Sequence, residues 1–288
     1  MAENGRTVDA VVTDERVLYL YGVIPRDQGL PDEVGAAVQA VSHSAVVALV
    51  EPVCAQEFSP DTLNEKLKSI EWVASLAHKH EAVLECAMRH GPVVPARLCT
   101  LFCNTDSLRT SLAENEERFL ATLEWVQARE EWGLKVFCDQ GRLHAVVGLE
   151  DAQVRALDSE AAKASPGQAF VLRKRRDARL LDAAAARIDA MADETVEVLE
   201  HDAVDMRLRP LLLEAATGRT EPMVLNIAAL VDKSSCSAFR DRHALLSARF
   251  QAEGFSFEAS GPWPPYSFCD DEGTDATGSE AEPGEEGE

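Results

Sequence analysis

The chain has 288 residues and 46% of them are apolar, which is enough to bury the core of two compact domains or of one large domain. Its formal net charge is −22, and nine of the acids, with no lysine or arginine, lie after residue 260; this field disfavours nucleic acid and anionic membranes as partners. The sequence has no apolar run of the roughly 20 residues that cross a membrane and no secretory-type start, so the seven scattered cysteines predict reduced thiols in the cytoplasm.

Residues 1–16 are expected to be a flexible lead-in to a first domain over 17–140. A buried strand is predicted at 17–24, because this stretch is apolar and ends at a proline. Two further apolar runs, at 38–41 and 45–50, are separated by three polar residues and predict a hairpin.

The longest predicted element of this domain is a helix that begins after Ser59 and runs to about residue 90. Ser59 is a favourable N-cap, proline at position 60 suits the first turn, and apolar residues then recur at steps of three and four. Gly91-Pro92 ends the pattern. The segment from Pro92 to Phe102 reads as a strand leading into a loop, and its two prolines favour an edge position.

A second helix is predicted over 106–127, and a returning strand over 131–138. The order strand, hairpin, helix, strand, helix, strand is close to a ferredoxin-like sandwich, in which an antiparallel sheet carries two helices on one face. We therefore expect the strand at 131–138 to complete the first sheet.

Residues 141–166 look less regular and are expected to connect the two domains. A C-terminal α+β domain is predicted over 167–269, starting with a long helix to about residue 200. The second half of this helix is expected to bury Leu181, Ala184, Ile188, Met191, Thr195 and Leu199. The remaining predicted elements are strands at 204–208 and 222–231, a helix at 234–253 and a strand at 255–259. Residues 270–288 are rich in Gly, Glu and Asp, which predicts a disordered acidic tail.

The fold class predicted is therefore α+β, with two ferredoxin-like α/β sandwich domains, antiparallel sheets and long helices. No phosphate-binding glycine loop, dinucleotide fingerprint or nucleophile elbow occurs in the sequence. The chain is accordingly expected not to be an enzyme and to need no cofactor.

Metal-site patterns in the sequence are weak. There is no C-x-x-C, and Cys99 and Cys103, four residues apart, read as ordinary half-buried thiols. His78 and His80 are two apart on a helix and point to different faces, and no H-E-x-x-H occurs, so these residues and His90 are interpreted as structural or surface histidines. No metal ligands are predicted.

A basic stretch in the long helix is the strongest positive feature of this acidic chain. It comprises Arg173, Lys174, Arg175, Arg176 and Arg179. Three interpretations stay open: a solvated helix turn, a docking point for an acidic protein or tail, and a nucleic-acid grip that the net charge disfavours. Arg173, Arg175 and Arg176 are kept as candidate partner-binding residues.

Five segments together resemble one known family, the gas vesicle proteins F and L (GvpF/GvpL). These segments are Tyr19–Val23, Trp72–His80 with Ala82–Leu84 behind it, Val94–Phe102, Glu131–Val136 and Gly261–Phe268. The last segment contains the unusual string Gly-Pro-Trp-Pro-Pro-Tyr, and the resemblance runs from about Val17 to Phe268. The family tends to have Phe and Gly where Leu98 and Cys99 stand here, and cysteine is less free than glycine at φ > 0.

The resemblance implies two ferredoxin-like domains without catalytic residues, and a cytoplasmic accessory protein associated with gas vesicles. It implies binding of the small hydrophobic shell protein during vesicle nucleation, with other gas vesicle accessory proteins as further partners. An exposed apolar face and open strand edges would make such a subunit prone to aggregation, and an acidic protein that covers them would keep it soluble.

The candidate covering elements are the 92–102 segment, with Arg97 and Phe102, and the aromatic arm with Trp263 and Tyr266. The alternative for the arm is an internal latch that fixes the C-terminus onto the second domain, and Arg97 is equally able to pair with a carboxylate inside its own domain. The alternative function is a small-molecule-binding or enzymatic α+β protein, which requires a deep pocket lined by convergent polar groups and perturbed acids.

Overall fold

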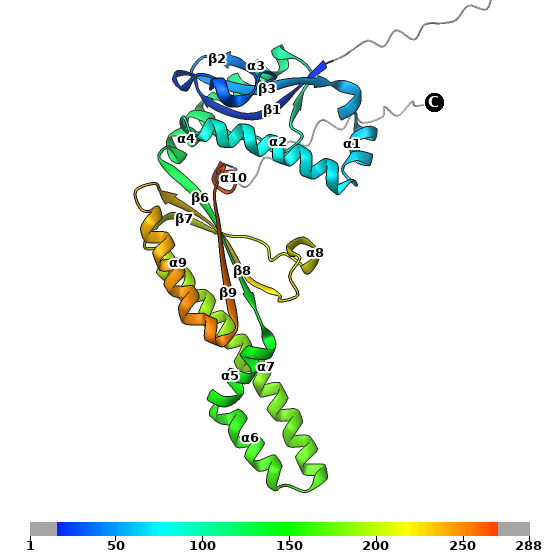
Figure 1. Cartoon of the computed structure of the whole chain (residues 1–288), viewed down its shortest axis with the longest axis vertical. Coiled ribbons are helices and arrows are strands. Elements are labelled where there is room, and N and C mark those ends of the chain that lie inside the picture. Colours follow the sequence, from blue (N-terminus) through cyan, green and yellow to red (C-terminus); the bar gives the residue numbers. More distant parts are fainter. Residues whose placement is uncertain (1–15, 270–288) are drawn as a thin grey trace, which may run out of the picture.

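The computed structural model describes residues 16–269, so the predicted lead-in up to residue 15 and the predicted acidic tail at 270–288 lie outside the described residues. The chain forms two sheets with their helices, stacked along the long axis of the molecule (Figure 1). A helical hairpin extends from the second sheet to the far end of the molecule (Figure 1).

The first unit contains five strands, four α-helices and three short 3-10 turns. In chain order they are β1 (Arg16–Pro25), η1 (Arg26–Gln28), η2 (Asp32–Val34), β2 (Gln39–His43), β3 (Val46–Cys54), η3 (Ala55–Phe58), α1 (Pro60–Lys66), α2 (Ile70–Met88), β4 (Val94–Pro95), β5 (Leu101–Phe102), α3 (Thr105–Glu114) and α4 (Glu116–Val126). The sheet order is β2-β3-β1-β4, β5 also pairs with β1, and all pairs are antiparallel. The predicted first strand and hairpin are confirmed.

The second unit follows the succession of a ferredoxin-like fold, with a strand, a helical crossover, two strands, a helix and a strand. Its elements are β6 (Arg129–Cys138), α5 (Gln140–Glu150), α6 (Ala152–Lys163), α7 (Pro166–Leu199), β7 (Ala203–Leu208), α8 (Glu214–Thr217), β8 (Met223–Asp232), α9 (Cys236–Phe250), η4 (Gln251–Glu253), β9 (Phe255–Trp263) and α10 (Tyr266–Cys269). The order β7-β8-β6-β9 repeats, strand for strand, the order of the first sheet. The α+β fold class is confirmed.

The strand expected to complete the first sheet lies instead at the centre of the second. β6 pairs with β8 on one side and β9 on the other, so the prediction that 131–138 belongs to the first sheet is wrong. The physical reason is that β4 and β5 already occupy the open side of β1, while β6 pairs with two apolar strands, β8 and β9, in the second unit. Sheet membership therefore places β6 with 167–269 rather than with 17–128.

The segment 141–166, expected to be irregular, forms two helices, α5 and α6. Each begins at an aspartate: the Asp139 side chain accepts a hydrogen bond from Arg142 N (3.0 Å), and Asp151 accepts from Gln153 N and Val154 N (2.9 and 2.8 Å). Both aspartates are helix-starting signals that the prediction overlooked. The two helices pack along the first half of α7.

Both long helices predicted for the first unit are interrupted. The helix from Ser59 breaks after Leu67, and Ser69 caps α2 by accepting from Trp72 N (3.3 Å). The helix at 106–127 breaks at Asn115, whose side-chain amide donates to Ser111 O (2.8 Å) and competes with the helical ladder.

Helices cover opposite faces of the first sheet, contrary to the predicted arrangement on one face. Tyr19 and Tyr21 of β1 face α2, whereas Leu20 and Val23 face α3 and α4. A bulge between Leu20 and Gly22 shifts the alternation of side chains along β1. Gly22 is required there, because a Cβ would lie 2.8 Å from Val94 O.

The second sheet carries α7 and α9 on one face, and the core lies between them. Leu134, Val136, Leu225 and Ile227 pack against these helices. Within α7, Ala184, Met191, Thr195 and Leu199 are buried as predicted and Ile188 is half-buried; Leu181, however, is 59% exposed and Leu180 faces the core.

Candidate functional site

The C-terminal arm joins the two units rather than projecting into solvent. Tyr266 packs against the core of the first unit, beside α2, and its hydroxyl donates to Glu81 Oε1 (3.3 Å). The next residue, Ser267, donates from its N–H and its hydroxyl to the carboxylate of Glu131 on β6 (2.9 and 2.7 Å). The arm is therefore an internal latch, and it crosses onto the first unit instead of holding only the second.

Burial shapes the electrostatics of this latch. Removal from water raises the pKa of Glu131, and the two hydrogen bonds from Ser267 oppose that rise. Burial likewise raises the pKa of Glu81. Trp263, by contrast, is 41% exposed, and its indole N–H donates to Ser260 Oγ (3.0 Å).

The candidates of the 92–102 segment are also tied to their own unit. Phe102 of β5 is half-buried against the α3/α4 face of the first sheet. Arg97 is exposed, and its carbonyl accepts from both N and Oγ1 of Thr100 in a tight turn. Cys99, in the same turn, adopts φ 66°, a conformation that glycine enters more easily.

A buried hydrogen-bonded network holds this turn to α2. His80, 1% exposed, contacts Ala96 O through Nε2 (3.1 Å) and the Tyr19 hydroxyl through Nδ1 (2.8 Å). The carbonyl only accepts, so Nε2 carries the proton and the tyrosine donates to Nδ1. Cys99 N in turn donates to the Tyr19 oxygen (3.3 Å). Burial lowers the pKa of His80, and the structural interpretation of this histidine fits the satisfied network.

The basic stretch divides into two parts along α7. Arg176 pairs with Asp158 of α6 (3.3 Å), and Arg179 pairs with Asp151 (2.6 Å), so these two arginines fasten α6 to α7. Arg173 and Arg175 are exposed in the first third of α7, the part that packs against α6. Candidate residues from the basic stretch and from the arm therefore lie at opposite ends of the second unit.

The largest run of exposed apolar side chains in the second unit is one that the prediction did not single out. We call residues 208–213, the end of β7 and the connection to α8, the leucine loop. Its four leucines are exposed to between 38% and 80%: Leu208, Leu211, Leu212 and Leu213. The loop adjoins β7, which lies at the edge of its sheet and carries the charged pair Asp205–Arg207 (3.6 Å).

The backbone of the leucine loop is held in place by β8. Arg209 N donates to Asn226 O (2.8 Å), and the Asn226 side chain donates back to Pro210 O (2.7 Å). These bonds continue the pairing of β7 past its last residue. The leucines are thus presented on an anchored chain, with less conformational entropy to lose on binding than in a free loop.

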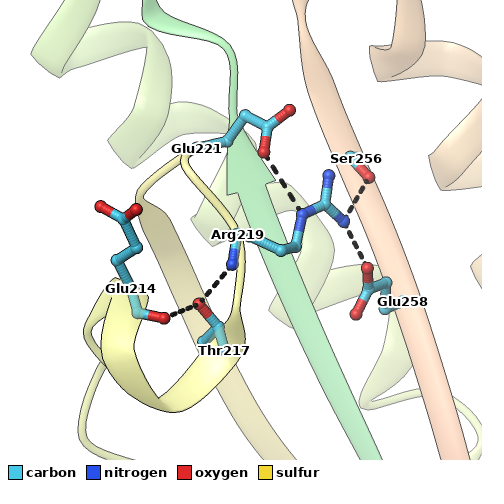
Figure 2. A network of polar contacts seen from close by, with 6 residues as sticks. All are labelled: Glu214, Thr217, Arg219, Glu221, Ser256 and Glu258. Carbon is cyan, nitrogen blue, oxygen red and sulfur yellow. Dashed lines mark hydrogen bonds and ion pairs between the residues drawn. The ribbon is translucent and has the colours of Figure 1, made fainter.

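Arg219, which lies between α8 and β8, is the second anchor of the connection from β7 to β8 (Figure 2). Arg219 bonds to Glu221 and Glu258 and donates to Ser256 Oγ (3.3 Å), and its backbone N–H donates to Thr217 Oγ1 (3.3 Å). Its guanidinium also lies 4.3 Å from the ring centroid of Phe137. Arg219 thereby clamps the far end of the connection over the face of the sheet that α7 and α9 leave open.

Three consecutive leucines after Pro210 were the sequence signal for this surface. They follow the end of a strand, where a polar turn is usual, and so mark an exposed apolar patch.

Within residues 16–269, no helix combines the length and the apolar composition that a membrane-spanning helix requires.

Comparisons with known proteins agree on one family. Residues 17–270 match the family model described as gas vesicle synthesis protein GvpL/GvpF. The chain is 27% identical to gas vesicle protein L of Streptomyces sp. (strain CB03234), covering 90% of this chain and 94% of that one, and 28% identical to gas vesicle protein L2 of Halobacterium salinarum, covering 86% and 85%.

Solved structures show the same fold. The crystal structure of the gas vesicle protein GvpF from Anabaena sp. superposes with a TM-score of 0.62 at 18% identity, over 88% of this chain and 96% of that chain. GvpF from Microcystis aeruginosa gives a TM-score of 0.61 at 17% identity, over 88% and 99%. The chain belongs to the GvpL/GvpF family of gas vesicle accessory proteins.

Proposed function

We propose that this protein binds the small hydrophobic gas vesicle shell protein, keeps it from aggregating during vesicle nucleation and assembly, and remains as a minor, vesicle-associated component. Other gas vesicle accessory proteins are proposed as further partners. The observation that carries the proposal is the leucine loop, an apolar surface held rigidly beside an open strand edge.

Physical chemistry supports this use of the surface. Four leucines that lose their remaining water contact on binding contribute about 25 cal/mol for each Å² of apolar area buried. The charge pair Asp205–Arg207 on β7 discourages indiscriminate strand addition, so the apolar contact is confined to the loop. The net charge of −22 favours solubility of a complex with an aggregation-prone subunit.

The proposal replaces the two surfaces expected from the sequence. Tyr266 and Phe102 pack most of their apolar surface against the cores of the first unit, which leaves little of that surface for a partner. Trp263 stays partly exposed and lines a cavity of about 500 Å³ with Glu130 and Lys233.

That cavity is the feature relevant to a small-molecule or enzymatic role. It lies between the end of α2 and the β6/β9 side of the second sheet, and its lining includes two acids, Glu85 and Glu130. The carboxyl groups with raised pKa, Glu81 and Glu131, do not line it; they bond to the arm instead. We therefore favour binding over catalysis.

The test is co-expression with the shell protein, scoring the fraction of shell protein that stays soluble. Leu211→Asp and Leu213→Asp are expected to lower that fraction strongly. Leu245→Asp is the matched control, because Leu245 is 71% exposed on α9, far from the loop in sequence, and Leu213 is 80% exposed. Equal retention by all three variants would contradict the proposed surface; no retention by the unmodified protein would contradict the function.

A further inference from the structure

Three side chains of metal-ligating types converge at the C-terminal end of α2, and none of the three lines the cavity beside Trp263. Cys86 and His90 lie four residues apart and so project from the same side of the helix end. Glu33 comes from η2, in the connection between β1 and β2. One ligand atom from each, a sulfur, a ring nitrogen and a carboxylate oxygen, lie within 4.8 Å of one another.

The histidine is already held in the tautomer that a metal requires. His90 Nδ1 lies 3.0 Å from Cys86 O, and a carbonyl oxygen only accepts, so Nδ1 carries the proton. In the neutral ring Nε2 then carries a lone pair that can bind a metal, and this nitrogen lies 3.9 Å from Glu33 Oε2. A backbone carbonyl bonded to the other ring nitrogen is the usual outer support of a metal-bound histidine.

The scaffold around the three donors is rigid. Cys86 is 3% exposed within the core of the first unit, and Val34, the residue after Glu33, is 8% exposed in the same core. Pro31, on the other side of η2, is also buried. Core packing therefore places Glu33 over the helix end, while the carboxylate and the imidazole remain open to solvent for metal entry.

We propose that Glu33, Cys86 and His90 form a site for a divalent transition-metal ion, with Zn²⁺ as the best match to a thiolate, imidazole and carboxylate set. Bond lengths of about 2.0–2.3 Å place tetrahedral donors about 3.5 Å apart, so the side chains close by about 1 Å. The Cys86 thiol releases its proton to solvent as it binds, and water fills the fourth position.

The ion would join the β1–β2 connection to α2. Core packing already joins the two, but the polar contacts of Glu33 with the helix end are long: its Oε2 lies 3.9 Å from Arg89 Nη2 and 3.9 Å from His90 Nε2, and such contacts between exposed groups contribute little. A bound metal replaces them with coordinate bonds and stabilises the folded state by mass action. The site is independent of the leucine loop, so the two proposals fail separately.

The probe is Co²⁺, added to the reduced, chelator-treated full-length protein. We expect one equivalent to bind with a thiolate-to-cobalt charge-transfer band in the near ultraviolet, and Zn²⁺ to displace it. Cys86→Ser is expected to abolish the band. His90→Ala and Glu33→Gln, which change exposed side chains and leave the core intact, are expected to weaken binding by about tenfold or more.

Matched controls are available on the same helix and among the other thiols. His78→Ala removes an exposed histidine of α2, and Cys103→Ser removes an exposed thiol; neither is expected to change the band or the affinity. The proposal is overturned if cobalt gives no charge-transfer band, if the band survives Cys86→Ser, or if His90→Ala and His78→Ala bind cobalt equally well.

Discussion

Replacing Tyr266 by alanine tests whether the aromatic arm is an internal latch. The ring packs on the first unit while the adjacent Ser267 bonds to the second, so loss of the ring removes one of the contacts that couple the two units. Tyr266→Phe is the companion variant, because it keeps the ring and removes only the hydroxyl that bonds to Glu81.

The expected loss of stability follows from burial and bond length. Truncating a fully buried aromatic side chain costs about 3–5 kcal/mol, and Tyr266 is half-buried, so the ring contributes about 2–3 kcal/mol. The hydroxyl bond is long at 3.3 Å and contributes about 0.5–1 kcal/mol. Tyr266→Ala is therefore expected to lower the unfolding free energy by about 3 kcal/mol, and Tyr266→Phe by less than about 1 kcal/mol.

Urea unfolding followed by tryptophan fluorescence measures both variants. With a slope of about 3 kcal/mol per molar urea, Tyr266→Ala shifts the midpoint down by about 1 M. A change below about 0.5 kcal/mol in Tyr266→Ala would refute the latch and return the residue to the list of partner-binding candidates.

Three further predictions concern the rest of the structure. Burial lowers the pKa of His80 below its usual 6.5, so the unfolded state binds more protons than the folded state below about pH 6.5. The free energy of unfolding is therefore expected to fall as the pH drops through this range, and to fall less in His80→Leu. Urea unfolding at about pH 5 and about pH 7 measures the difference. Arg219→Ala is expected to cost about 1–2 kcal/mol by losing its carboxylate partners and its contact with Phe137, with faster amide exchange in residues 209–222; unchanged exchange would contradict its clamping role. Leu213→Asp is expected to change thermal stability by no more than about 0.5 kcal/mol, and a larger loss would mean that the side chain packs internally.

Local patterns predicted the individual elements well, because periodicity and end signals act within a few residues. Ser165-Pro166 and the apolar spacing placed α7 correctly, and the alternation at 255–259 found the start of β9. The same logic failed at Asp139 and Asp151, which are equally good helix starts: the helix after Asp139 has only a weak apolar face, and the helix after Asp151 was overlooked although it buries Val154 and Ala161. The one-position error at Leu180 and Leu181 arose because both residues fit an apolar stripe, and packing against the sheet selects between them.

Long-range pairing was beyond the sequence. Nothing in residues 129–138 tells whether this strand pairs with 94–95 or with 223–232, since the alternation of apolar side chains marks a strand and not its partner. The same limit applies to the candidate residues: the sequence does not tell whether an aromatic side chain such as Tyr266 packs on its own chain or on a partner, and in this structure the ring packs beside α2. The Cys86–His90 pair escaped notice because its third partner, Glu33, lies more than fifty residues earlier.

Co-expression decides whether this protein holds the shell protein in solution, and the quantity to measure is the soluble fraction of the shell protein. We expect the shell protein to stay in solution with the unmodified protein and with Leu245→Asp, and to precipitate with Leu211→Asp and Leu213→Asp. A shell protein that precipitates equally in every case would contradict the claim that this protein acts by holding that subunit.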